Sequence, residues 1–210
     1  MNRSRGTQPH DTSDLASSDE PRYRDVRTMT AAAPASTVFA VVCAIGGERG
    51  WPSYNWAWRL RGLVDRAIGG VGLRRGRRNP HTLRAGDPLD FWRVTEVRAP
   101  GADTPGVLQL RAEMRLPGDA WLEFRVTPHR DGATLRQQAL YAPSGLFGRL
   151  YWWVMLPFHG MIFPTMAANL VRAAERVAAT SSGAPTAPPA ARDDGRAAAD
   201  RGRRRARRAG

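Results

Sequence analysis

The middle of the chain alternates between apolar and polar residues, which is the pattern of a β-strand that covers a core with one face. In VLQLRAEMRL (107–116), apolar side chains occupy every second position, and amide or charged side chains lie between them. The same alternation recurs in DFWRVTEV (90–97), AWLEFRV (120–126) and ATLRQQALY (133–141). Turn sequences such as LPGD and PHRDG separate these segments, so we expect four consecutive antiparallel strands that share one apolar face.

Helical spacing replaces this alternation nearer the N-terminus. Residues 34–47, PASTVFAVVCAIGG, begin with a proline and end with two glycines, which predicts a short helix. Residues 53–70, SYNWAWRLRGLVDRAIGG, predict a second helix with an apolar stripe of Trp56, Leu60, Leu63, Val64, Ala67 and Ile68. Arg61 and Asp65 are four residues apart and can pair on its solvent-facing side. A weaker strand, YRDVRTMTA (23–31), precedes both helices.

A long apolar segment near the C-terminus is the candidate cover for the apolar face of the sheet. It spans residues 146–179, and its last part is plainly amphipathic. Pro157 and Pro164 each remove a backbone donor, so we expect the helix to kink or divide there. Together these elements predict an α+β fold of the helix-grip type, in which a curved antiparallel sheet wraps around a long C-terminal helix.

The same segment raises the question of a membrane span. Residues 150–171 carry no formal charge, and about twenty apolar residues suffice to cross a bilayer. His159, Asn169 and the two prolines argue against a span, and insertion would leave the apolar face of the sheet uncovered. We therefore expect no transmembrane segment, while association with a membrane surface stays open.

The two ends of the chain have the composition of disordered tails. Residues 1–22 lack the apolar stretch that a signal peptide needs. Residues 180–210 are dense in proline, alanine, glycine and arginine and end in a basic cluster. This cluster is interpreted as a solvated end of the chain, with weak binding to polyanions as the alternative. The sequence therefore predicts one folded domain over residues 23–179 between two tails.

The overall charge says little about function. The chain has 32 basic residues, all of them arginine, against 19 acidic ones, for a net charge of +13. A GC-rich genome also produces an excess of arginine, so the count alone does not identify a partner. The single cysteine, Cys43, excludes an intramolecular disulfide framework and a zinc site built on cysteine pairs, and it favours a cytoplasmic location.

The segment GGVGLRRGRRNP (69–80) invites comparison with phosphate-binding loops. Its glycines lack the G-x-G-x-x-G spacing of a dinucleotide fingerprint, strands follow where a helix is needed, and the chain has no P-loop lysine. We interpret Gly69 and Gly70 as the stop of the preceding helix. The arginines of the segment are expected on a solvated sheet edge, with binding of an acidic partner as the alternative. They are Arg74, Arg75, Arg77 and Arg78.

Side chains suited to catalysis are sparse. The four histidines have no metal-binding spacing, and no G-x-S-x-G elbow occurs. His159 lies in the segment expected to cover the sheet, where it is either an acid–base group or a hydrogen-bonded structural residue. Glu113 and Glu123 fall on the polar face of the sheet and are interpreted as surface ion-pair partners. Gln137 and Tyr141 share the apolar face, where they either point into the interior or bond nearby backbone.

Several longer motifs resemble a known protein family. They are IGGERGWPSYNWAWRLRGLVDRAIGGVGLRRGRR, GDPLDFWRVTEV, RAEMRLPGDAWLEFRV and SGLFGRLYWWVMLPFHGMIF. Over residues 25–178 the chain resembles an uncharacterised bacterial domain family of the SRPBCC (START-like, polyketide-cyclase-like) superfamily. The resemblance implies a helix-grip fold with an internal apolar cavity. That domain is often fused behind an atypical short-chain-dehydrogenase-like NAD(P)-binding domain, so a separate NAD(P)-dependent oxidoreductase is an implied partner.

These observations predict a protein that binds a small hydrophobic or amphipathic molecule between the sheet and the C-terminal helix. The candidate lining residues are Leu110, Met114, Phe124, Gln137, Tyr141, Trp152 and His159. No catalytic residue, cofactor or metal is expected, and binding is favoured over turnover. Two alternatives stay open. One is a cyclase- or dehydratase-like enzyme that uses His159 or Tyr141, and the other is an accessory module for an oxidoreductase or an anionic surface.

Overall fold

The structure, a computed structural model, describes residues 23–67, 69–70, 72, 77, 79 and 82–182. Six strands, three α-helices and one short 3-10 helix make up this part of the chain. In chain order they are β1 (Tyr23–Ala31), α1 (Ala35–Cys43), η2 (Gly47–Arg49), α2 (Asn55–Ala67), β2 (Pro88–Leu89), β3 (Trp92–Arg98), β4 (Gly106–Ala112), β5 (Gly118–His129), β6 (Gly132–Pro143) and α3 (Gly145–Ser182). The predicted α+β class and helix-grip arrangement are confirmed.

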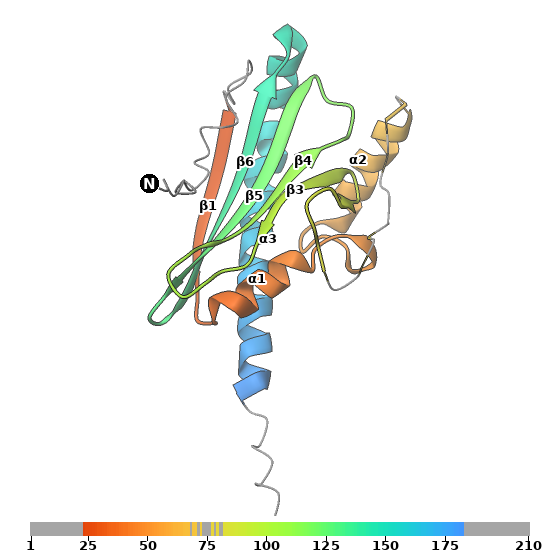
Figure 1. The fold of residues 1–210 in the computed structure, drawn as a ribbon. Coiled ribbons are helices and arrows are strands. Elements are labelled where there is room, and N and C mark those ends of the chain that lie inside the picture. The colour runs from red at the N-terminus through yellow and green to blue at the C-terminus, as the bar shows by residue number, and fades with distance from the viewer. Residues whose placement is uncertain are drawn as a thin grey trace, which may run out of the picture.

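All six strands form one antiparallel sheet in the order β1-β6-β5-β4-β3-β2. The four alternating segments became β3 to β6, and the weaker segment became the edge strand β1 (Figure 1). The largest shortening relative to the sequence prediction is in β4, which ends at Ala112 rather than continuing to residue 116. The N–H of Arg115 donates to Oδ1 of Asp65 at 2.6 Å, so the chain leaves the sheet there.

The core lies between one face of the sheet and the helices α1 and α3. Figure 1 shows α3 running behind the sheet, with α1 crossing near one end of the strands. The largest fully buried side chains come from all three layers and include Leu108, Leu110, Leu122, Phe124 and Leu135 of the sheet, Val38 and Val42 of α1, and Met166 of α3. The apolar positions of the alternating strands therefore do what their period predicts, which is to pack against helices.

α3 is one continuous helix of 38 residues that contains both Pro157 and Pro164. Of the two predicted outcomes, a kink or a division, the structure excludes the division. Ile162, Phe163 and Met166 are buried and flank the second proline, so tertiary packing holds the backbone in place. The hydroxyl of Thr165 also donates to the carbonyl of Met161 at 2.9 Å within the same turn.

Candidate functional site

The helix α2 presents its apolar side outward, which reverses the sequence prediction. The α2 stripe, defined as Trp56, Leu60, Leu63 and Val64, is 48–66% exposed. Asp65, expected at the solvent, is 1% exposed. Its carboxylate accepts the N–H of Gly72 at 2.8 Å and that of Arg115 at 2.6 Å, and it lies 3.8 Å from the guanidinium of Arg61. These bonds satisfy the buried charge, and they turn the polar side of the helix inward.

The described glycines Gly70 and Gly72 of the glycine-rich segment lie against Asp65 of the preceding helix. The N–H of Gly72 is already bound to the carboxylate of Asp65, and Gly69, with φ of +78°, ends α2 as predicted. Arg77 donates to the carbonyls of Cys43 at 2.8 Å and Ile45 at 2.9 Å, so it caps the C-terminal end of α1 instead of lying on a solvated edge. Arg74, Arg75 and Arg78 lie outside the described residues.

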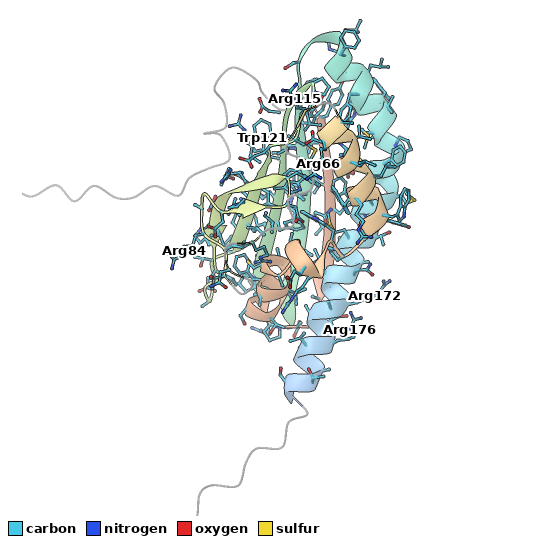
Figure 2. The ribbon with its side chains drawn as sticks, turned by 90° about the vertical axis from the view of Figure 1, so that its right-hand side faces the viewer. Arg66, Arg84, Arg115, Trp121, Arg172 and Arg176 are labelled. Carbon is cyan, nitrogen blue, oxygen red and sulfur yellow. The ribbon has the colours of Figure 1, made fainter. Side chains whose placement is uncertain are left out.

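A cavity of about 520 Å³ lies between α2, α3 and the adjoining end of the sheet. Its walls are almost entirely apolar: Trp56, Leu60 and Val64 come from α2, Leu122 and Ala139 from the sheet, and Trp152, Met155 and Phe163 from α3. The three α2 residues are half exposed, so they form a rim where the cavity meets the surface. Figure 2 shows α2 and α3 on the same side of the sheet.

The structure places the seven predicted lining residues in two groups. Met114, Tyr141, Trp152 and His159 line the cavity. Leu110, Phe124 and Gln137 do not; they are at most 1% exposed and belong to the packed interior of the sheet. The two groups differ in their position along the length of the elements. An alternating pattern shows which face of a strand is apolar and does not show where along it the cavity lies. All seven assignments as ligand-binding residues stay predictions.

An aromatic stack closes one end of the cavity. The ring of Trp152 lies 4.9 Å from Tyr23 and 6.0 Å from Tyr141, and both pairs are nearly parallel. The hydroxyl of Tyr141 donates to the carbonyl of Pro117 at 2.8 Å. Burial, and then the neighbouring Tyr151 and Tyr23, raise the pKa of Tyr141 to about 12. Its phenol is thus protonated at neutral pH and engaged in holding the turn before β5.

His159 contributes a neutral imidazole to the cavity wall. Its ring packs edge-on against Trp152 at 5.1 Å and Phe163 at 4.5 Å. Burial lowers the pKa of His159 to about 4, and the nearby Asp25 offsets this only in part. Its Nδ1 atom is buried and has no hydrogen-bond partner among the described residues. His159 is consequently a poor general acid at neutral pH, although it retains a free nitrogen.

Two charged residues beside His159 escaped the sequence analysis. Asp25 and Arg27 of β1 form an ion pair of 3.0 Å, and both affect the pKa of His159. In the strand register they lie opposite Ala139 and Gln137, the inward-facing positions of β6. The side-chain amide of Gln137 donates to the carbonyl of Phe163 at 3.4 Å. The alternation of β1 places Asp25 and Arg27 on the same face of the strand. Both faces of β1 are mixed in polarity, so the pattern does not show which face points inward.

The two glutamates considered for acid–base chemistry lie away from the cavity. Glu113 pairs with Arg93 at 2.6 Å, and Glu123 lies 3.4 Å from Arg125. Glu123 is nevertheless buried, between Gln109 and Gln138 on the neighbouring strands. Among the described residues no group of three or more histidine, cysteine, aspartate or glutamate side chains could hold a metal ion.

Comparison with known proteins adds a family and a set of similar folds. The model of a family described as "Protein of unknown function (DUF2867)" matches residues 17–166. Norcoclaurine synthase from Thalictrum flavum is similar over 82% of this chain and 97% of its own, at 13% identity and a TM-score of 0.41. CalU16 from Micromonospora echinospora is similar over 75% of this chain and 86% of its own, at 13% identity and a TM-score of 0.35. CV1439 from Chromobacterium violaceum is similar over 74% of this chain and 96% of its own, at 12% identity and a TM-score of 0.36. No curated protein matches the chain.

Proposed function

We propose that this chain, which belongs to the DUF2867 family, binds a small hydrophobic or amphipathic molecule in the cavity between α2, α3 and the sheet. The observation that carries the proposal is the cavity itself. Its volume of about 520 Å³ is within the range of about 300–1,000 Å³ that is usual for small-molecule sites. Its apolar walls favour a ligand with apolar surface.

An enzymatic role in the same cavity is the second candidate. His159 and Tyr141 both line it, so the two side chains converge as a cyclase- or dehydratase-like catalyst requires. Their ionisation favours binding instead, because the low pKa of His159 makes it a weak base and the hydroxyl of Tyr141 is already bonded to the backbone.

We further propose a cytoplasmic location, on the grounds that the one cysteine is a half-buried thiol whose pKa burial raises to about 11. Within the described residues, only the segment Gly145–Ser181 has the length and hydropathy of a membrane span, and it is a core helix on one side. A partnership with an NAD(P)-dependent oxidoreductase stays a prediction of the family resemblance.

The binding proposal is tested with a hydrophobic dye and a variant that fills the cavity. Met155→Trp adds volume from the cavity wall, and we expect it to weaken binding of 1-anilinonaphthalene-8-sulfonate by about tenfold. Val154→Trp is the matched control, because the neighbouring side chain is 57% exposed and does not line the cavity. Equal dye binding by both variants and the unchanged protein, together with no co-purified small molecule in native mass spectrometry, would contradict the proposal.

A further inference from the structure

The first half of α3 has a second apolar side that packs against nothing in the described structure. The α3 stripe, defined as Leu146, Phe147, Leu150, Trp153, Val154 and Met161, is 39–82% exposed. These residues recur at helical spacing over about 22 Å of helix. The opposite side of the same helix carries the buried Trp152, Phe163 and Met166. A helix that is apolar on all sides, with one side bare, lacks an apolar partner there.

The α2 stripe extends this bare surface across the mouth of the cavity. Trp56, Leu60 and Val64 are both exposed and part of the cavity rim, and Phe158 joins them from α3 at 41% exposure. Phe158 is one helical turn from Val154 of the α3 stripe, so the exposed apolar surface continues from the cavity rim onto that stripe. We call the α2 stripe and the α3 stripe together the helical face. Because the carboxylate of Asp65 fixes α2 with this side outward, the exposure is built into the fold.

The exposed charges on the two helices of the helical face all have one sign. The exposed charged residues of α2 are Arg59 and Arg66, and the first 27 residues of α3 carry Arg149 alone. The only carboxylate in these two stretches is the buried Asp65. Arg66 and Arg115 lie beside α2 in Figure 2. Apolar side chains bordered by arginine match the interface of an anionic bilayer, where the apolar groups enter the acyl boundary and the guanidinium groups meet phosphates.

We propose that the helical face binds the surface of an anionic lipid membrane, with α2 and α3 lying in the interface. The inner side of α3 is packed on the sheet, so the helix lies on the bilayer rather than crossing it. A second copy of the chain fits this face poorly, because its own α2 and first part of α3 offer arginines and no exposed carboxylate to pair with them. The inference goes beyond ligand binding and does not depend on it.

The test is co-sedimentation of the full chain with vesicles of phosphatidylcholine alone and of phosphatidylcholine with phosphatidylglycerol. We expect binding to the anionic vesicles, and a loss of about tenfold in partitioning for the double variant Leu150→Ser/Trp153→Ser, whose side chains are 58% and 63% exposed. Val177→Ser is the matched control, because Val177 is an exposed residue of the same helix outside the helical face. Leu146→Ser/Phe147→Ser replaces the first variant if that one does not fold.

Three results would overturn the inference. The first is absence of vesicle binding by the unchanged chain. The second is equal vesicle binding by the double variant and the unchanged chain, which would mean that arginines outside the helical face hold the chain on the vesicles. The third is a concentration-dependent dimer that Trp153→Ser disrupts and that does not bind vesicles, which would make the face a contact between copies. None of these measurements uses a cavity ligand, so dye binding in the cavity remains a separate question.

Discussion

The residue with the largest consequence for pH behaviour is His159. In the folded chain its imidazole is neutral down to a pKa of about 4, because burial disfavours the charged form. In the unfolded chain the same group titrates near 6.5. Between these two values the unfolded chain binds a proton that the folded chain does not, so the contribution of His159 to stability is fully present above pH 6.5 and declines as the pH falls towards 4.

We therefore predict that His159 makes the free energy of unfolding decrease by about 2 kcal/mol between pH 7 and pH 5. His159→Phe should remove that part of the pH dependence, and urea denaturation at the two pH values measures it. His129→Phe is the control, because His129 is exposed. Identical pH profiles for His159→Phe and the unchanged protein would contradict the prediction, because they would show that the imidazole has the same pKa in the folded and the unfolded chain.

At the scale of elements, the orientation of α2 depends on one buried carboxylate. Asp65 joins the helix to two separate segments by accepting the N–H groups of Gly72 and Arg115. We predict that Asp65→Ala lowers the free energy of unfolding by about 3 kcal/mol, because both donors then lose their partner inside the protein. Chemical denaturation measures this, with the exposed Asp131→Ala as control. A loss no larger than that of the control would mean that α2 is held by its tryptophans alone.

The helix α3 tolerates a proline on its solvent side at a measurable cost. Pro157 is exposed and inside the helix, where its ring removes one hydrogen bond to the carbonyl of Trp153. Pro157→Ala restores the donor and the helix propensity, so we predict a gain of about 1–3 kcal/mol in the free energy of unfolding. Thermal denaturation with Val154→Ala as a control at an exposed helical position measures it. A lower melting temperature would indicate that the proline ring itself stabilises the folded chain.

For the molecule as a whole, the strands were predictable and the inward face of α2 was not. Alternation in a strand is a local property, so the segments that became β3 to β6 and the edge strand β1 could be found from the sequence. The side of α2 that faces inward depends on Asp65 meeting the N–H groups of Gly72 and Arg115, and the latter is 50 residues away. The rule that apolar stripes face the core fails here because distant backbone donors decide the orientation.

The candidate site follows the same division. Tyr141, Trp152 and His159 could be placed near the cavity because their segments were expected to face each other. Phe124 and Gln137 were assigned to the lining although the strands bury them completely in the packed interior. The position along a strand at which packing ends and empty space begins is set by the lengths of the opposing helices. That quantity is absent from any local pattern.

The rim residues Trp56, Leu60 and Val64 serve the cavity and the helical face at once. A guest that leaves through this opening between lipid-bound helices would pass from protein into hydrocarbon without a fully hydrated stage. The rate of ligand release would then depend on the amount of membrane present rather than on the solubility of the ligand in water. The released ligand would diffuse in the plane of the membrane.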